Sequence, residues 1–227
     1  MARGISVMPS GAARVSQWPR RWWVRWIRRG LLIGWYLPSL HAFYKLEVHG
    51  REHLAELRRP ALIVSNHNMH LDQSMLLWAM PAGFRAKVTI AAAEKDIFGN
   101  RFRGFVSALL GNAFPFAKEG AGIRESLGHV AGLLDDGWHV LLFPEGKLTV
   151  CGPTQPFKAG IGLLARETRA QVLPMRIDVI RPGLVEGRWR PIPRARVRVS
   201  IGAPISIPPK MGHAEATALL EDAVRLA

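Results

Sequence analysis

Residues 61–80 read ALIVSNHNMHLDQSMLLWAM, and this stretch decides how the rest of the chain is organised. The apolar run of residues 61–64 predicts a short buried strand. Residues 73–80 predict an amphipathic helix with Asp72 at or near its N-cap, because Asp is a preferred capping residue. The loop between them therefore carries His67 where the chain leaves a strand and Asp72 where it enters a helix.

This tight strand-loop-helix turn can bring the side chains of His67 and Asp72 together. A carboxylate bonded to one imidazole nitrogen holds the ring in one tautomer and leaves the other nitrogen to take a proton. Such a pair is a general base for a hydroxyl or an amine. Two other interpretations stay open: a loop histidine beside a capping Asp72, or a metal site built from His67, His70 and Asp72. The nearby sequence holds no further His or Cys cluster to complete that metal site.

The chain is strongly basic. Its 227 residues carry a formal net charge of +14 and an isoelectric point near 11.2, which implies a polyanionic partner, either a nucleic acid or an anionic membrane surface. The length and the ordinary apolar content predict one domain with a sizeable core. The single cysteine, Cys151, excludes an intrachain disulfide and favours a reducing compartment.

Residues 1–44 concentrate both the arginines and the tryptophans. The segment has no acidic residue and contains seven arginines: Arg3, Arg14, Arg20, Arg21, Arg25, Arg28 and Arg29. It also holds five of the eight tryptophans: Trp18, Trp22, Trp23, Trp26 and Trp35. On a helical wheel Arg21, Arg25, Arg28 and Arg29 share one face, opposite Trp22, Trp23, Trp26, Ile27 and Gly30.

Trp prefers the membrane interface and Arg attracts acidic headgroups, so residues 18–29 predict an anchor that lies in the membrane plane. A basic arm that binds nucleic acid is the alternative, although such dense Trp has little use there. The uncharged run 30–44 is shorter than the ~20 residues of a spanning helix, and Pro38 and His41 interrupt it. It either dips into one leaflet or packs on the domain. We expect no signal peptide, because the basic region is too long and no small-residue cleavage site follows.

From Leu46 onward short apolar runs alternate with helical patterns, which predicts an α/β fold with a mixed β-sheet flanked by helices. Strands are expected over residues 86–92, 112–116, 138–143, 171–180 and 194–201. Helices are expected over residues 98–110, 122–134, 158–169 and 213–226. Arg alternates strictly with apolar residues in 194–201, so this strand is predicted to be an edge strand or a half-exposed one.

Two further stretches carry candidate site residues. Phe143-Pro144-Glu145-Gly146-Lys147 follows a buried strand, and strand ends are where α/β folds build sites. Pro144 stops the strand and Gly146 permits a sharp turn. Lys158 opens a predicted helix, where its charge opposes the helix dipole and so indicates a use beyond the helix. An ordinary surface turn and a solvated lysine are the alternatives.

Five motifs occur in an order that resembles the glycerophospholipid acyltransferase family, which includes lysophosphatidic acid acyltransferase. They are NHNMHLD (66–72), GNAFPFAK (111–118), FPEG (143–146), FKAG (157–160) and VLPM (172–175), and the resemblance covers about residues 45–207. It implies an αβ acyltransferase fold and a monotopic enzyme on the cytoplasmic face of a membrane. It also implies transfer of a fatty acyl group from acyl-CoA or acyl-carrier protein to a lipid hydroxyl, without a metal or bound cofactor. The chain then divides into a membrane-associating segment, residues 1–44, and an acyltransferase domain, residues 45–227.

The same resemblance implies roles for individual residues. His67 is the base and Asp72 its orienter. The acceptor is contacted by Asn66, Phe143, Pro144, Glu145 and Gly146, and residues 172–175 lie near the acyl donor. Where the family's second motif ends in Arg this chain has Lys118, and where the third continues Thr-Arg it has Lys147 and Leu148.

Both departures keep a cation near the family's phosphate-binding positions. We therefore predict that Lys118 and Lys147 hold the acceptor's phosphate, with Lys158 as a third cation, and that lysophosphatidic acid becomes phosphatidic acid. Two alternatives stay open: a lipid acceptor without a phosphate, or a basic module that binds membrane or nucleic acid without catalysis. The expected partners are an anionic membrane surface, the lysolipid and the acyl donor, and no nucleic acid.

Overall fold

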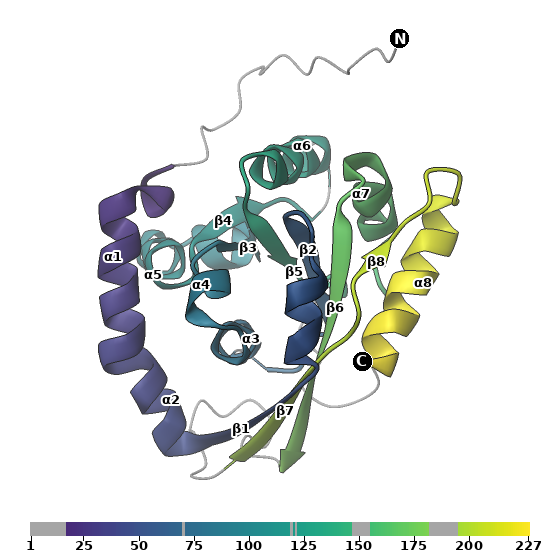
Figure 1. Ribbon diagram of the computed structural model, residues 1–227. Helices are drawn as coiled ribbons and strands as arrows, with labels where there is room; N and C mark the ends of the chain where they lie inside the picture. The colour runs from purple at the N-terminus through teal and green to yellow at the C-terminus, as the bar shows by residue number, and fades with distance from the viewer. Residues whose placement is uncertain (1–16, 70, 119, 121, 147–154, 182–194) are drawn as a thin grey trace.

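The fold is built on one mixed β-sheet (Figure 1). The computed structural model describes residues 17–69, 71–118, 120, 122–146, 155–181 and 195–227. Within these residues eight strands form the sheet in the order β1-β7-β6-β2-β5-β3-β4, and β8 pairs with β6. The strands are β1 (Tyr44–His49), β2 (Ala61–Ser65), β3 (Val88–Ala93), β4 (Ala113–Phe116), β5 (His139–Leu142), β6 (Gln171–Arg181), β7 (Ala195–Ile201) and β8 (Ile205–Ser206). The predicted α/β class with a mixed sheet is confirmed.

The centre of the sheet is parallel. β2 pairs in parallel with β5 on one side and with β6 on the other. β3 continues the parallel arrangement next to β5, and β4 next to β3. The carboxyl ends of these strands therefore meet at one edge, the carboxyl edge, and their starts meet at the opposite, amino edge. Loops that follow different strands come together at the carboxyl edge.

Strand β7 differs from its prediction in its place within the sheet. It lies between β1, which it pairs in parallel, and β6, which it pairs antiparallel, so it is not an edge strand. The half-exposed character is confirmed, because Arg196 and Arg198 are exposed while Val197 and Val199 are buried. A period of two reports which face of a strand is buried, and it carries no information on how many neighbours the strand has.

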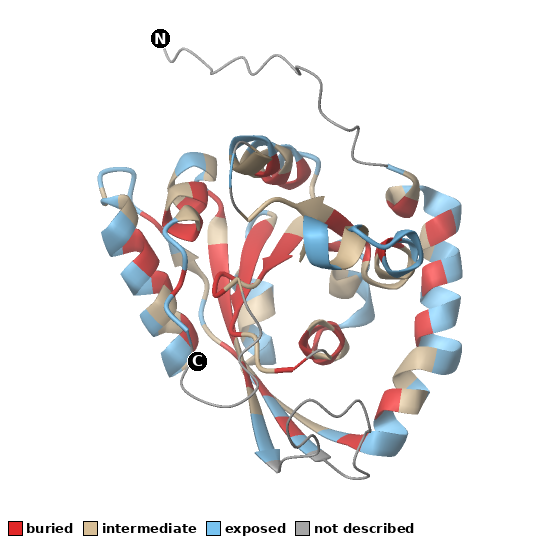
Figure 2. Ribbon diagram, turned by 180° about the vertical axis from the view of Figure 1, so that it is seen from behind, coloured by how far each residue is buried: buried red, intermediate tan, exposed pale blue. Residues whose placement is uncertain are grey.

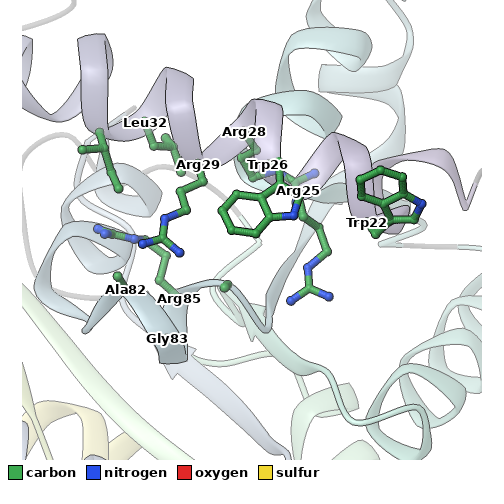
Figure 3. A pocket seen from close by; sticks show the side chains of 11 residues that line it. Trp22, Arg25, Trp26, Arg28, Arg29, Leu32, Ala82, Gly83 and Arg85 are labelled. Carbon is green, nitrogen blue, oxygen red and sulfur yellow. The ribbon is translucent and has the colours of Figure 1, made fainter.

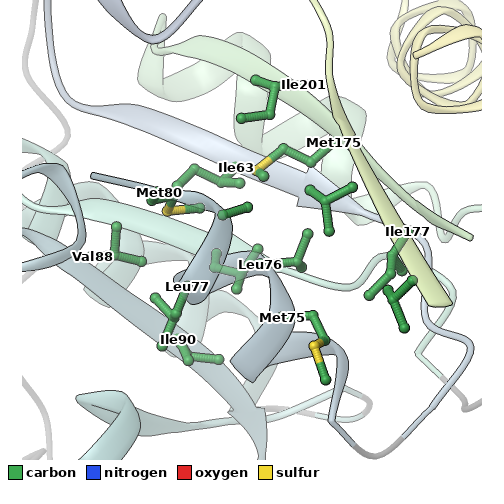
Figure 4. Close-up of a cluster of buried hydrophobic side chains, with 14 of the residues drawn as sticks. Ile63, Met75, Leu76, Leu77, Met80, Val88, Ile90, Met175, Ile177 and Ile201 are labelled. Atoms are coloured by element: carbon green, nitrogen blue, oxygen red, sulfur yellow. The ribbon is translucent and has the colours of Figure 1, made fainter. Parts of the chain in front are cut away.

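Helices cover both faces of the sheet. On one face α3 (Asp72–Ala79) packs Met75 and Leu76 against β2, β5 and β6 (Figure 4). The other face is covered by α6 (Gly122–Asp135), α7 (Gly160–Thr168) and α8 (His213–Leu226). The shorter helical elements are η1 (Trp18–Arg20), η3 (Arg51–Glu56), α4 (Ala82–Arg85) and η4 (Glu94–Phe98).

The central strands are buried on both faces, as the burial colours of Figure 2 show. Residues 61–64 of β2 have no exposed surface, which explains why this strand reads as an unbroken apolar run. Residues 172–175 of β6 are buried as well. The segment that was expected near the acyl donor is therefore part of the core, and its side chains pack between the sheet and the helices.

The N-terminal helices form one rod beside the domain (Figure 1). α1 (Trp22–Leu31) continues through a π-helical turn, η2 (Leu32–Tyr36), into α2 (Leu37–Phe43). Pro38 does not end the rod, although it stands in the first turn of α2 and removes one backbone N–H from the helical ladder. The wider π turn before it takes up the irregular geometry. Within the residues that the structure describes, no helix is both long enough and apolar enough to cross a membrane.

Residues 30–44 pack on the domain along one side of this rod. Leu32, Leu40 and Tyr44 are buried, and the Tyr36 hydroxyl lies 2.6 Å from Ser74 Oγ on α3. The opposite side of the rod is exposed.

Arg28 corrects the predicted faces of α1. Its guanidinium is buried and donates to the carbonyls of Leu109 at 2.6 Å and Ala108 at 3.1 Å. These carbonyls belong to the last turn of α5 (Arg101–Gly111), where a helix leaves its C=O groups without partners. Burial lowers the pKa of Arg28 to about 10. Arg28 thus holds α1 onto α5 and does not share the outer surface with Arg21, which is exposed.

Candidate active site

The predicted site lies at the carboxyl edge of the sheet. β2 ends at Ser65 and β5 ends at Leu142, and the register pairs Val64 with Leu142. The loop that begins at Asn66 and the turn that begins at Phe143 therefore leave the sheet side by side. Parallel pairing of two strands that are far apart in sequence is what joins the first and third motifs.

His67 and Asp72 form the expected pair. His67 Nδ1 lies 2.9 Å from Asp72 Oδ2, so Nδ1–H donates to the carboxylate and Nε2 is the ring nitrogen left to take a proton. The His67 side chain is 26% exposed and that of Asp72 is fully buried. A substrate can thus reach the imidazole, whereas water cannot reach the carboxylate that orients it.

Asp72 lies next to the N-cap of α3, as predicted, but does not itself cap the helix. The N-cap position of α3 is Leu71, and Asp72 is the first helical residue. Its Oδ2 turns back to accept the backbone N–H groups of Asn68 and, at 2.9 Å, of Met69. Burial raises the pKa of the Asp72 carboxyl, and the hydrogen bonds from His67 and these amides oppose the rise. The contacts show the expected pairing of Asp72 with His67 and no cap hydrogen bond from Asp72 to α3.

Two asparagines hold the loop to β6. Asn66 is buried, donates from Nδ2 to the Ile177 carbonyl at 2.9 Å and accepts the Ile177 N–H on Oδ1 at 2.8 Å. Asn68 Nδ2 donates to the same carbonyl at 2.8 Å. Because the backbone of β6 occupies both ends of the Asn66 amide, we assign Asn66 a positioning role in place of the predicted substrate contact.

The turn at residues 143–146 divides its side chains between the site and the interior. Phe143 stacks on the His67 ring, with ring centroids 4.4 Å apart and planes inclined by 25°. Glu145 is buried, and its Oε1 accepts the His67 backbone N–H at 2.8 Å while Oε2 accepts the Gln155 N–H at 3.0 Å. Pro144 is also buried. Phe143 thus faces the imidazole ring of His67, and Glu145 fixes the backbone that carries this ring.

Two of the three predicted cations meet at Gly146. Lys118 Nζ donates to the Gly146 carbonyl at 2.8 Å and pairs with Asp96 at 3.1 Å. The Lys158 side chain lies close to the same glycine, where a Cβ atom would come within 2.8 Å of Lys158 Cε. Gly146 adopts a φ of +69°, which a residue with a side chain rarely does. Lys147 lies outside the described residues.

Several contacts that build this site have no signal in the sequence. Asp96, from η4, and the backbone of Ile177 reach the site only through the fold, at separations of 22 and 111 residues. The metal alternative finds no support in the described part of the chain, which contains no group of three His, Cys, Asp or Glu residues placed to hold an ion. His70, the third ligand of that alternative, lies outside the described residues.

Comparison with known proteins agrees with this geometry. The family model described as Acyltransferase matches residues 45–178. A chloroplastic 1-acyl-sn-glycerol-3-phosphate acyltransferase of Arabidopsis thaliana is 28% identical over 171 residues, which are 75% of this chain and 46% of the relative. The 1-acyl-sn-glycerol-3-phosphate acyltransferase beta of Homo sapiens is 28% identical over 150 residues, 63% of this chain and 51% of the relative. The chain thus spans about half the length of these curated relatives.

A solved structure shares the fold. The crystal structure of the 1-acyl-sn-glycerophosphate acyltransferase of Thermotoga maritima superposes with a TM-score of 0.64 at 21% identity. The match covers 89% of this chain and 77% of that one. It includes the mixed sheet with its flanking helices.

Proposed function

The chain belongs to the acyltransferase family, and we propose that it transfers a fatty acyl group to the free hydroxyl of lysophosphatidic acid. Relatives named for this reaction support the choice of acceptor. The observation that carries the proposal is the His67–Asp72 pair, in which a buried carboxylate orients a half-open imidazole at the carboxyl edge of the sheet.

The pair supports a direct transfer. His67 Nε2 takes the proton of the acceptor hydroxyl while the hydroxyl oxygen attacks the carbonyl carbon of the acyl thioester. Asp72 stabilises the imidazolium that forms, as the acid of a serine-protease triad does, but here the nucleophile is the substrate. The C–S bond then breaks and the thiolate leaves with the proton from His67. An ester is formed, and the histidine returns to its neutral state.

The acceptor's phosphate is proposed to bind at Gly146. Lys118 and Lys158 converge on this residue, next to the turn whose Phe143 stacks on His67. A phosphate there would compete with Asp96 for Lys118, and Lys147 is proposed to add a further cation. Lysine is a point charge without the bidentate fork of arginine, so the phosphate should be held less strictly than by an arginine.

The donor is proposed to be a fatty acyl thioester of coenzyme A or of acyl-carrier protein. The thioester already contains the activated acyl group and its leaving group. The reaction as proposed therefore needs no metal and no bound cofactor, and the protein's part is to position two substrates and move one proton.

We propose that the enzyme works at the cytoplasmic face of a membrane. Large apolar side chains are exposed along the rod and on the adjoining α5: Trp22, Trp23, Trp26, Ile27, Ile33, Trp35, Phe102 and Phe105. The ring of Trp18 in η1, just before the rod, stacks on Phe105 of α5 with centroids 5.3 Å apart, so the start of the rod adjoins α5. Exposed Trp with flanking Arg is typical of a helix that lies in the membrane interface. Arg28 takes no part in this surface.

A two-substrate assay tests the reaction. We expect thiol release from an acyl-CoA only when a lysolipid is present, with a lipid product carrying the labelled acyl chain, and the assay is repeated with acyl-carrier protein as donor. Release without a lysolipid, or no release with either donor, would show that the chain is not this transferase and would favour the non-catalytic basic module.

The phosphate assignment has its own test. We expect Lys118→Ala to raise the KM for lysophosphatidic acid about 10-fold, the lower end of what a charge-assisted hydrogen bond supplies, with little change in the maximal rate. The exposed Lys210 provides the control, and Lys210→Ala should leave both constants unchanged. Equal losses by Lys118→Ala on lysophosphatidic acid and on an uncharged monoacylglycerol would contradict a phosphate contact and leave acyl transfer standing.

A further inference from the structure

A cavity separates the N-terminal rod from the domain at a distance from His67. It lies between α1 and α4, with a volume of about 330 Å³ (Figure 3). α4 ends just before β3, and β3 begins at the amino edge of the sheet, where Val88 pairs with His139. His67 lies beyond the carboxyl edge of the parallel strands. The cavity is therefore separated from the proposed active site by the length of the sheet.

The polar lining of this cavity is cationic. Arg25, Arg28 and Arg29 enter from α1 and Arg85 from α4, and no acidic residue lines the cavity. Figure 3 shows Arg29 extending from its helix toward Arg85. Within the described residues none of the four makes an ion pair with a carboxylate. Arg28 donates to the carbonyls of Ala108 and Leu109 and Arg85 to that of Leu77, while the Arg29 guanidinium lies 5.5 Å from the Trp26 ring. Guanidinium groups placed together without a counter-charge repel each other, and a bound anion would relieve that repulsion.

The remaining wall of the cavity is apolar and reaches the exposed surface of the rod. It includes Trp22, Trp26, Leu32 and Ile33, and the side chains of Trp22 and Trp26 are 73% and 64% exposed. An anion that enters here meets aromatic and aliphatic side chains beside the arginines. This combination suits an amphiphile better than a free ion, because a free ion would leave the apolar wall in contact with water.

We propose that this cavity binds the phosphate of an anionic phospholipid of the bilayer, as a second lipid site separate from the acceptor site. Arg29 and Arg85 hold the phosphate oxygens, since a planar guanidinium can bind two of them at once. Trp22 and Trp26 contact the glycerol and the upper part of the acyl chains. The volume matches a headgroup with its first chain carbons, at the small end of ligand cavities. The proposal rests on the membrane association proposed above and does not depend on acyl transfer.

Two double variants with the same change in net charge test this site. Arg29→Gln with Arg85→Gln removes two guanidinium groups of the cavity. Arg21→Gln with Arg101→Gln removes two exposed ones from α5 and the start of α1. Partition of the full chain is measured by flotation with vesicles of phosphatidylcholine and phosphatidylglycerol. Both variants should lose the part of vesicle binding that depends on net charge alone. We expect the partition coefficient of the cavity variant to fall about 10-fold further, since this variant also loses charge-assisted hydrogen bonds.

Equal losses in the two double variants would overturn the site and leave only general attraction between charges. Thermal unfolding reports whether Arg85→Gln prevents folding. If it does, the single variants Arg29→Gln and Arg21→Gln are compared instead, and we again expect the cavity variant to lose more vesicle binding. Inorganic phosphate provides a further arm. Phosphate should compete with the lipid headgroup for Arg29 and Arg85, so we expect it to remove the excess binding of the wild type when chloride at equal ionic strength does not. Equal effects of the two salts would overturn the site. If the wild type shows no excess binding to vesicles but is stabilised by phosphate more than the cavity variant in thermal unfolding, the free ion is the ligand and the lipid assignment is wrong.

The His67→Ala chain separates this proposal from the proposed function. It should partition onto the vesicles as the wild type does, although it transfers no acyl group. A cavity variant that partitions normally while the wild type is active would sink the lipid site alone. A wild type that is inactive on lysolipids but shows the excess loss in the cavity variant would leave the lipid site standing without the transferase.

Discussion

Two histidines of this chain make the same contact in different surroundings. His67 and His53 each place Nδ1 2.9 Å from a carboxylate oxygen, of Asp72 and of Glu56. The histidine side chains are also similarly exposed, 26% and 29%, but the Asp72 side chain is fully buried and that of Glu56 is 53% exposed. The difference between the proposed catalytic pair and a surface pair therefore lies in the carboxylate and not in the distance.

Burial changes what the carboxylate can do. Glu56 sits three residues after His53 on η3, where water competes for both partners and the pair contributes little. The buried Asp72 carboxylate is not exposed to water, and its Oδ2 is held in place by the backbone amides of Asn68 and Met69. A carboxylate fixed in this way costs no reorganisation when the imidazole gains a proton, which is the condition for electrostatic stabilisation of a transition state.

The largest effect is expected when the two histidines are removed in turn. His67→Ala should lower the rate of acyl transfer on the order of 10³- to 10⁴-fold, the upper range for a positioned general base. His53→Ala should leave the rate unchanged. Initial rates of thiol release in the presence of lysophosphatidic acid measure both, with thermal unfolding to confirm that each variant is folded. An active His67→Ala enzyme would remove the base from the mechanism.

The second-largest effect is expected when the carboxylates of Asp72 and Glu56 are replaced by amides in turn. Asp72→Asn keeps the shape of the side chain but loses its charge, so it can still accept a hydrogen bond while it no longer stabilises the imidazolium. We expect a loss on the order of 10²-fold in the maximal rate. Glu56→Gln, the matched exposed change, should have no effect. Equal losses of activity in Asp72→Asn and Glu56→Gln would contradict the conclusion that burial of the carboxylate distinguishes the two pairs.

The contrast between local and distant contacts also shows what the sequence can predict. The His67–Asp72 pair spans five residues inside one strand-loop-helix unit, so residue types and spacing alone pointed to it. Helix α8 was predicted with its observed bounds, because its amphipathic pattern needs no information from elsewhere. The spacing of Lys118 and the 143–146 turn in the sequence does not predict that they share a site. The resemblance to a family predicted it.

Contacts between distant segments could not be predicted in this way. A helical wheel placed Arg28 with the outer arginines, since the wheel separates faces without saying which one is covered. Its partner carbonyls at Leu109 and Ala108 are 81 and 80 residues away. The sequence also does not predict that the Asn66 amide hydrogen-bonds to the backbone of Ile177. Nor does it predict that β7 has β1 as its second neighbour. These depend on the packing of elements, which the local pattern does not contain.

Arg28 and Arg21 extend the comparison to cations, because Arg28 is buried and Arg21 is exposed. Arg28→Gln would leave the last carbonyls of α5 without their charged donor in a buried place, and we expect a loss of about 2 kcal/mol in the free energy of unfolding. Arg21→Gln should change it by less than about 0.5 kcal/mol, as is usual for surface substitutions. Urea unfolding of both variants measures the two values. An unchanged midpoint for Arg28→Gln would show that α1 is held to α5 by its apolar contacts alone.

A third histidine, His139, extends the comparison to a half-buried ring without a carboxylate. Its Nδ1 accepts the Ala61 N–H at 3.1 Å, and its ring stacks on Phe84 with centroids 4.2 Å apart. Burial, together with the charge of the nearby Lys87, lowers the pKa of His139 to about 4. Protonation would place an N–H group against the N–H of Ala61, so the folded state keeps this ring neutral.

The smallest effect is therefore expected in the pH dependence of stability. As pH falls below about 6.5 the unfolded chain gains a proton on His139, whereas the folded chain does not until about pH 4. The unfolded state binds more protons in this window, so the free energy of unfolding decreases as pH falls from about 6.5 to about 4. A shift of this size corresponds to roughly 3 kcal/mol for a fully buried ring, and the partial exposure of His139 reduces our expectation to about 1–2 kcal/mol.

His139→Asn isolates this contribution, because the Asn carbonyl can accept the Ala61 N–H but does not titrate. Urea unfolding of both chains at pH 7 and near pH 4.5 gives four free energies. We expect the wild type to lose about 1–2 kcal/mol more than the variant between the two pH values. His53→Asn makes the same substitution on η3, outside the sheet, and is the control for the substitution itself. If His139→Asn and the wild type lost equal stability, the ring would be free to protonate in the folded chain, and burial without a carboxylate would not be enough to keep a histidine neutral.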